Sequence, residues 1–276
     1  MFFSPNDDFD LEKIATSGQC FRWEKIAGGY RILHDKHSLI IKELGDGKFE
    51  VLADEGEFNA IWRQYLDLDE NYAKIRERID AKDDFLLAAA KSEKGIRILR
   101  QEPFETLISF IISQNKNIPA IEKSVFLITK YCGEQKRDAL GEIYYSFPTP
   151  EKIANLDDQI LIDCKLGYRA PYVKKAAEAF CEGKINFDKL KKMNSDDAIK
   201  ELQQLYGVGL KVASCISLFG LHHLNAFPKD VWVKRILAEF YKNGYPYEKY
   251  SPYNGIYQQY AFEYYRKLAL KEATVK

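Results

Sequence analysis

One segment, residues 195–235, limits the folds open to this chain more than any other stretch. Ser195 is followed by two aspartates, and side-chain oxygens of this kind accept the free N–H groups at the start of a helix. Gly207 and Gly209 then flank a single valine and end that helix, because glycine readily adopts the backbone conformations of a tight reversal. Apolar residues resume helical spacing from Leu210 onward. The segment therefore predicts two helices joined by a short hairpin.

The hairpin Gly207-Val208-Gly209 is expected to leave unpaired backbone N–H groups at the start of the second helix, where a phosphate oxygen or another anion can accept them. Lys211 lies just inside that helix. Asp230 comes later, behind a proline and a lysine, where it would cap the next helix. The sequence thus predicts one amine and one carboxylate at two helix starts, beside an anion-binding site formed by backbone N–H groups.

This segment resembles the helix-hairpin-helix, Gly/Pro-rich loop and aspartate signature of base-excision DNA glycosylases, in which the lysine marks the lyase-capable members. Three further motifs resemble the 8-oxoguanine DNA glycosylase/lyase group. In chain order they are Ser17-Gly18-Gln19-Cys20-Phe21-Arg22-Trp23, Ser113-Gln114-Asn115-Lys116-Asn117-Ile118 and Leu166-Gly167-Tyr168-Arg169-Ala170. Each motif alone is weak evidence, but the four together cover most of the chain in the expected order.

Residues 1–99 are predicted to form a small N-terminal α+β domain. Runs rich in aromatic and β-branched residues fill positions 19–53, and Gly28-Gly29 and Asp46-Gly47 interrupt them. Because Asp-Gly between alternating runs favours a hairpin, we expect an antiparallel meander there. Further elements expected in this half are helices at 57–66, 71–79 and 84–91 and a strand at 95–99.

Residues 100–276 are predicted to form an all-helical domain that carries the hairpin. Apolar residues recur on one face between Phe104 and Ile111, and Asn117 is expected to cap a second helix with Pro119 in its first turn. The fold class that follows is α+β, an antiparallel sheet domain with flanking helices followed by a helical domain. Further helices are expected at 171–180, 195–205, 210–221, 231–241 and 253–270.

The cysteines and the termini bound the compartment and the cofactors. Five cysteines are scattered without C-x-x-C spacing, which favours reduced thiols in a cytosol over disulfides or zinc. The four-cysteine cluster that holds iron and sulfur in some related glycosylases is absent, and neither a membrane span nor an export signal is visible. We expect a cytoplasmic monomer, nucleoid-associated if prokaryotic, without cofactor, bound metal or membrane contact. Whether a structural cation binds at the hairpin stays open.

The charge distribution leaves two interpretations open. The whole chain has a formal net charge of zero, which is unusual for a protein that binds a polyanion. Residues 1–99 hold 15 basic and 20 acidic side chains, and residues 100–276 hold 26 and 21, so the balances are −5 and +5. The positive half contains the hairpin and could face duplex DNA, or both halves could be ordinary solvated surfaces.

The resemblance implies specific chemistry for the two helix-start residues. A lysine amine is a nucleophile only in its neutral form, and the family resemblance implies that Lys211 attacks the deoxyribose, expels the base and forms a Schiff base that permits β-elimination. Asp230 taken alone is a helix cap. The resemblance implies that it also places negative charge beside the cation-like sugar as the base departs, and the two roles are compatible.

The resemblance also implies a pocket for a flipped base. The Gly18 carbonyl would accept the N7–H that 8-oxoguanine has and guanine lacks, although taken alone Gly18 is a turn glycine. Cys215 and Phe262 would sandwich the ring, and Gln258 would meet its Watson–Crick edge. Cys215 lies four residues after Lys211 and hence on the same helical face. Gln258 and Phe262 are matched by spacing alone and could instead belong to the core.

A wedge that fills the space of the extruded base is implied by a third set of residues. Asn115, Tyr168 and Arg169 match the asparagine, aromatic wedge and arginine of the family, although such residues are also common on ordinary surfaces. Many relatives place a second arginine, which reads the opposite cytosine, where this chain has Ala120. We therefore predict weaker discrimination among opposite bases than in those relatives.

Two alternatives to an 8-oxoguanine glycosylase with abasic-site lyase activity stay open. An alkylbase glycosylase of the same architecture would use Asp230 with water as the nucleophile and would not need Lys211. A non-catalytic helix-hairpin-helix module would bind duplex DNA with a steep salt dependence and show no turnover.

Overall fold

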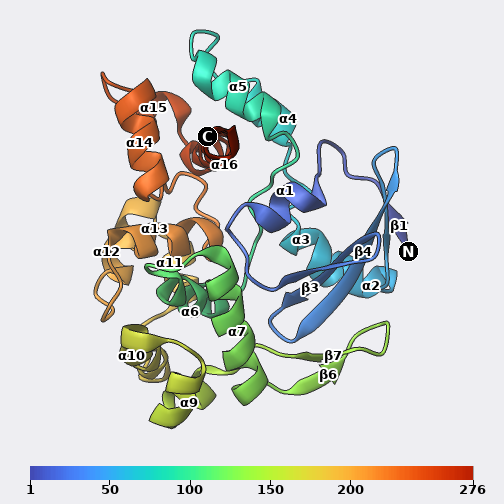
Figure 1. Ribbon diagram of the computed structural model, residues 1–276, viewed down its shortest axis with the longest axis vertical. Helices are drawn as coiled ribbons and strands as arrows, with labels where there is room; N and C mark the ends of the chain where they lie inside the picture. Colours follow the sequence, from blue (N-terminus) through green and yellow to red (C-terminus); the bar gives the residue numbers. More distant parts are fainter. Residues whose placement is uncertain (276) are drawn as a thin grey trace.

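The computed structural model describes residues 1–275, with side chains described through residue 270, and combines an N-terminal sheet with a helical body (Figure 1). The sheet is antiparallel with the strand order β1-β5-β4-β3-β2, which confirms the predicted meander and adds one short edge strand. Asp46 and Gly47 both have positive φ, 52° and 68°, which suits the hairpin turn that Asp-Gly predicts. The strands are β1 (Phe2–Phe3), β2 (Trp23–Ile26), β3 (Gly29–His34), β4 (His37–Gly45) and β5 (Lys48–Val51).

The predicted strand at Gly95–Leu99 is wrong. The segment has no regular secondary structure, and distant side chains take the place of a neighbouring strand. The Ile98 N–H donates to the Tyr72 hydroxyl at 2.8 Å, and the Leu99 N–H donates to Gln19 Oε1 at 2.9 Å. These partners satisfy the buried backbone donors without a sheet ladder, and no sequence pattern marks them.

The helices that accompany the sheet follow the predicted positions, except that the helix at Leu11–Thr16 was not predicted. The expected helix at 57–66 consists of three consecutive pieces, a short α-helix, a π-helical turn at Phe58–Trp62 and a second short α-helix. Asn71 and Asp83 cap the two helices that follow it. The bounds are α1 (Leu11–Thr16), α2 (Glu55–Glu57), α3 (Arg63–Tyr65), α4 (Tyr72–Arg76) and α5 (Asp84–Ser92).

The second half is helical as predicted, with one exception. Residues 135–145 form a small hairpin of β6 (Gln135–Arg137) and β7 (Ile143–Tyr145), so the expectation of helix throughout is wrong there. Asp138 explains the local turn, because its Oδ1 accepts the N–H groups of Leu140 and Glu142. The helices are α6 (Pro103–Ser113), α7 (Ile118–Cys132), α8 (Pro150–Ala154), α9 (Asp158–Asp163), α10 (Ala170–Cys181), α11 (Phe187–Lys191), α12 (Ser195–Leu202), α13 (Leu210–Phe219), α14 (Val231–Phe240), α15 (Tyr247–Tyr250) and α16 (Asn254–Val275).

Two hydrophobic cores overlap in sequence. One core lies between the sheet and the helices α1 to α3, and it ends at Leu99. The other fills the helical body and also takes in α4 and α5, which pack beside α16. The helices α4 and α5 therefore belong by packing to the helical body, although they precede the predicted boundary between residues 99 and 100.

A buried ion pair joins the sheet to the helical body. The guanidinium of Arg22 donates to Glu105 Oε2 at 3.0 Å and to the Tyr145 carbonyl at 2.6 Å. Glu105 also accepts the N–H of Asp35 at 3.0 Å, at the turn between β3 and β4. Because each charge is both paired and hydrogen-bonded, the junction tolerates their burial. It fixes the chain segment that contains Gly18 relative to α6.

Candidate active site

The predicted helix-hairpin-helix is present as α12, the turn at Gly207 and α13. The helix α12 begins at Ser195 as predicted, with Asp196 and Asp197 in its first turn, but its cap is the preceding Asn194, whose Oδ1 accepts the N–H of Asp197 at 2.9 Å. The helix α13 begins after Gly209, where no side chain caps it. Among the described residues, no atom beyond the adjoining ones in the chain lies within 4 Å of the position that a Gly209 Cβ would occupy. The N-terminus of α13 is thus open for an anion to approach its N–H groups.

Gly207 fits only because it has no side chain. Its φ of +81° lies in the left-handed region, and a Cβ at this position would fall 2.3 Å from Cγ of Tyr172. Tyr172 packs edge-on against both Tyr168 and Tyr206, with ring centroids 5.9 and 5.1 Å away. We call Tyr168, Tyr172 and Tyr206 the tyrosine cluster. It connects the hairpin physically to the predicted wedge.

Lys211 and Asp230 both influence one buried thiol electrostatically. Burial raises the pKa of the Cys215 thiol, while the Lys211 amine lowers it and the Asp230 carboxylate raises it further, so both charged groups act on one sulfur atom. Lys211 Nζ also lies 5.5 Å from the ring centroid of Phe110. Asp230 Oδ1 accepts the N–H of Val233 at 2.8 Å and caps α14 as predicted. One helix start thus supplies the amine, and the next supplies the carboxylate.

Gly18 presents a carbonyl that the protein itself leaves unused. The carbonyls on either side are occupied, since Ser17 O accepts from Gln259 Nε2 at 2.6 Å and Gln19 O accepts from Gln101 Nε2 at 2.8 Å. Within residues 1–275, the Gly18 oxygen accepts no hydrogen bond. Gly18 has a φ of +74°. A partly exposed carbonyl oxygen held between two bonded neighbours is suited to accept an N–H group from a ligand.

Of the two residues on α16 predicted for the base pocket, Phe262 lies beside Gly18. A Cβ at Gly18 would lie 4.0 Å from Cε1 of Phe262 and 3.7 Å from Cδ1 of Ile118. Gln258 is one helical turn before Phe262, and its buried Oε1 has no hydrogen-bond partner in the described part of the chain. An unpaired buried amide oxygen is costly unless a ligand satisfies it. Among the described residues, α16 also buries unpaired oxygens of Asn254, Tyr260 and Glu263, so this atom fits the predicted pocket without excluding the alternative that α16 serves only as core.

The wedge residues come together, but the two members of the Tyr-Arg pair differ in exposure. Asn115, with a φ of +50°, donates from Nδ2 to the Tyr168 hydroxyl at 3.1 Å. Tyr168 is 51% exposed, whereas Arg169 is only 6% exposed. The Arg169 guanidinium donates to the carbonyls of Gln114 and Leu166 and stacks on the Tyr168 ring at 4.3 Å. Arg169 thus holds the wedge loop in the structure without DNA.

Sequence reasoning missed two side chains of this site. Tyr172 follows Tyr168 by four residues, so helical spacing of aromatic residues could have indicated it. Phe110 lies in α6, all of whose residues are buried, and nothing in the sequence separates it from its neighbours. In residues 1–275, no three His, Cys, Asp or Glu side chains gather as a metal site would require. None of the described helices is long and apolar enough to cross a membrane.

Comparison with known families agrees with this geometry. The family model of the 8-oxoguanine DNA glycosylase N-terminal domain matches residues 1–107, and that of the HhH-GPD superfamily of base excision DNA repair proteins matches residues 108–249. The chain belongs to the 8-oxoguanine DNA glycosylase family. It is an N-glycosylase/DNA lyase of base excision repair, as the resemblance of its motifs predicted.

Relatives of this family align over most of the chain. A probable N-glycosylase/DNA lyase of Methanothermobacter thermautotrophicus is 30% identical over 270 residues, which cover 84% of this chain and 83% of the relative. The 8-oxoguanine glycosylase/lyase of Clostridium acetobutylicum, solved with dsDNA containing cytosine opposite to 8-oxoG, is 33% identical with a TM-score of 0.89 over 98% of both chains. A 3-methyladenine DNA glycosylase of Archaeoglobus fulgidus, at 21% identity and a TM-score of 0.76, shares the fold.

Proposed function

We propose that Lys211 is the nucleophile with which this glycosylase/lyase removes 8-oxoguanine from duplex DNA. The observation that carries the proposal is the position of Lys211 in the first turn of α13, at its uncapped start, where its amine and the Asp230 carboxylate both act electrostatically on the buried Cys215 thiol. An alkylbase glycosylase that activates water would use the Asp230 carboxylate and would give the Lys211 amine no catalytic role. The placement of the amine therefore favours the lyase mechanism over this alternative.

The reaction proceeds through a covalent bond to Lys211. The neutral amine attacks C1′ of the lesion deoxyribose as the bond from C1′ to N9 breaks, and the base leaves with the electron pair and takes up a proton. Opening of the sugar ring gives a Schiff base between Nζ and C1′. Loss of a C2′ proton then breaks the C3′–O bond and nicks the strand, and water hydrolyses the imine. Asp230 stabilises the positive charge that develops on the sugar.

Base recognition is assigned to the pocket between the Gly18 loop and α16. The free Gly18 carbonyl accepts the N7–H of 8-oxoguanine, where guanine offers only a lone pair. Cys215 and Phe262 stack on the two faces of the base, and the unpaired Gln258 amide bonds to its Watson–Crick edge. The buried, unsatisfied Gln258 oxygen and the unpaired Gly18 oxygen support this assignment.

Duplex binding is assigned to the hairpin and the wedge. The hairpin Gly207-Val208-Gly209 binds a backbone phosphate through the free N–H groups at the start of α13, without reading sequence. The Val208 N–H itself donates to the Leu205 carbonyl at 3.1 Å and shapes the turn. Tyr168 fills the space of the extruded base, helped by Asn115, whose amide holds its hydroxyl. Arg169 contacts the opposite strand only after its guanidinium breaks the hydrogen bonds to the carbonyls of Gln114 and Leu166 and bonds to DNA instead. We further propose that the enzyme acts as a monomer in the cytoplasm, at the nucleoid if the source is prokaryotic.

Borohydride trapping tests the nucleophile. Incubation with an 8-oxoguanine duplex and borohydride should leave a covalent protein–DNA adduct, because borohydride reduces an imine to a stable amine. Lys211→Gln should abolish the adduct, and Lys200→Gln should not, since Lys200 pairs with Asp197 on the surface of α12. An undiminished adduct in Lys211→Gln would refute the assignment. Excision without any adduct in the wild type, or preference for an alkylated purine, would favour the alkylbase alternative.

A further inference from the structure

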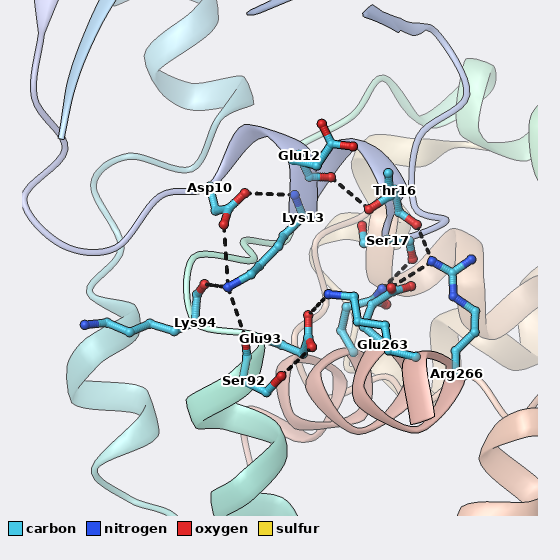
Figure 2. Close-up of polar contacts among 12 residues, drawn as sticks. Asp10, Glu12, Lys13, Thr16, Ser17, Ser92, Glu93, Lys94, Glu263 and Arg266 are labelled. Atoms are coloured by element: carbon cyan, nitrogen blue, oxygen red, sulfur yellow. Dashed lines mark hydrogen bonds and ion pairs between the residues drawn. The ribbon is translucent and has the colours of Figure 1, made fainter. Parts of the chain in front are cut away.

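The loop that contains Gly18 is held by the last helix of the chain. We call residues 17–19 the recognition loop. From α16, Gln259 Nε2 donates to the Ser17 carbonyl at 2.6 Å, and Arg266 Nη2 donates to the Thr16 carbonyl at 2.7 Å. Figure 2 shows Arg266 reaching across from α16 to the end of α1, where Thr16 and Ser17 lie. The two contacts tie α1 and the recognition loop to α16.

Arg266 contacts both walls of the proposed base pocket. Its guanidinium bonds to Thr16 at the end of α1 and lies 5.6 Å from the ring centroid of Phe262. The buried carboxylate of Glu263 fixes the guanidinium at 2.8 Å (Figure 2). A side chain held in this way links the residue just before the recognition loop to the Phe262 ring, because a shift between them would break the hydrogen bond to Thr16 or the cation–π contact with Phe262.

The sequence of α16 separates two tasks on adjoining faces. Gln258 and Phe262 are four residues apart and line the pocket, whereas Gln259, Glu263 and Arg266 recur at i, i+4 and i+7 and face α1. The face toward α1 thus runs parallel to the face that lines the pocket. One rigid helix therefore positions the Phe262 ring and the Gly18 carbonyl together.

The Ser17 contact acts on Gly18 through a planar peptide. The Ser17 carbonyl and the Gly18 N–H belong to the same peptide unit, so fixing the former orients the latter. On the other side, Gln19 is held by its own side chain, which donates from Nε2 to the Arg97 carbonyl at 2.8 Å. The Gly18 carbonyl lies between these two anchored units. The direction of this carbonyl is therefore set by the contacts of Ser17 and Gln19.

We propose that Gln259 and Arg266 are positioning residues that determine how well the enzyme distinguishes 8-oxoguanine from guanine. They act through the Gly18 carbonyl, so the inference rests on the base-recognition role proposed above. A hydrogen bond to the N7–H requires the oxygen within about 3.2 Å and in line. Without the two contacts from α16, the loop moves relative to Phe262, and the oxygen loses this alignment. Cleavage of an abasic site needs no base recognition and is spared.

The test compares affinities in a background without turnover. In Lys211→Gln protein, dissociation constants are measured for two duplexes that differ only in 8-oxoguanine or guanine at one position. Gln259→Met and Arg266→Met should each lower the ratio of the two affinities about tenfold, by weakening binding to the 8-oxoguanine duplex alone. Arg266→Lys keeps one donor and should recover most of the ratio. With Lys211 intact, cleavage of a preformed abasic site should stay within about twofold of the wild-type rate.

Lys267→Met is the matched control. Lys267 lies on α16 beside Arg266 and pairs with the buried Glu93, but it does not contact the recognition loop. It should leave the affinity ratio unchanged. The inference is overturned if the Gln259 and Arg266 variants keep the wild-type ratio, or if excision and abasic-site cleavage fall in parallel, as a general structural defect would cause. Absence of discrimination in the parent Lys211→Gln protein would instead refute the proposed role of Gly18, so the two failures are distinguishable.

Discussion

Replacement of Gly207 by alanine should damage both the stability of the protein and its grip on DNA. An alanine at the φ of +81° found there costs about 1–2 kcal/mol through backbone strain. The new Cβ would also lie 2.3 to 2.7 Å from three Tyr172 ring atoms, so the ring must move. Loss of its two edge-on contacts within the tyrosine cluster adds about 1–2 kcal/mol. The expected loss in unfolding free energy is therefore about 2–4 kcal/mol.

Gly209→Ala is the matched control for this prediction. Gly209 has a φ of −84° and open space around its Cβ position, so alanine should change stability by no more than about 1 kcal/mol. Thermal unfolding should place Gly207→Ala roughly 5–10 °C below the wild type and Gly209→Ala close to it. Duplex affinity should fall in both, because a methyl group at Gly209 lies on the path of the phosphate.

A double variant separates the two contributions. Tyr172→Ala removes the ring that the new methyl group would strike but leaves the backbone strain. Combined with Gly207→Ala, it should therefore be less destabilising than the sum of the two single changes. Equal stability of Gly207→Ala and Gly209→Ala would refute the reasoning, because the left-handed φ and the close approach to Tyr172 would then carry no energetic weight.

Three further predictions concern catalysis, base pairing and pH. Asp230→Asn keeps an oxygen for the Val233 N–H and should unfold within about 0.5 kcal/mol of the wild type, yet lose on the order of 100-fold in excision rate; near-normal turnover would contradict this. With Ala120 in place of an arginine, excision rates opposite the four bases should differ by less than roughly 100-fold, the factor that one bidentate contact can supply. Burial raises the pKa of Glu102 to about 7. The contribution of Glu102 to the free energy of unfolding is therefore full below about pH 4.5 and is lost as the pH rises through 7. Glu102→Gln should make the melting temperature less dependent on pH between pH 5 and 8, and an unchanged profile would refute the assignment.

Local signals predicted those parts of the fold in which neighbours in sequence decide the conformation. The Asp46-Gly47 turn, the Gly207–Gly209 hairpin and the cap at Asp230 each depend on residues within a few positions, and all are present. The segment at 95–99 has its backbone donors satisfied by Tyr72 and Gln19, which are distant in sequence. Periodicity cannot anticipate such partners, so that segment was predicted as a strand.

The candidate site shows the same division. Helical spacing placed Lys211 and Cys215 on one face, and the structure brings them together. The burial of Arg169 was not foreseeable, because it depends on the carbonyls of Gln114 and Leu166 converging on one guanidinium. The unused oxygen of Gly18 was equally invisible, since only the structure shows that both adjacent carbonyls are occupied.

The position of α16 has a consequence for damaged or truncated copies of the protein. Its tyrosines Tyr257 and Tyr260 are buried in the main core, and the same helix carries Gln258 and Phe262 of the proposed base pocket. Deletion of α16 would therefore expose that core, so the fragment that retains Lys211 and Asp230 should not fold. A chain without α16 should therefore unfold and be degraded by proteases, and no active nicking enzyme without base selectivity should accumulate.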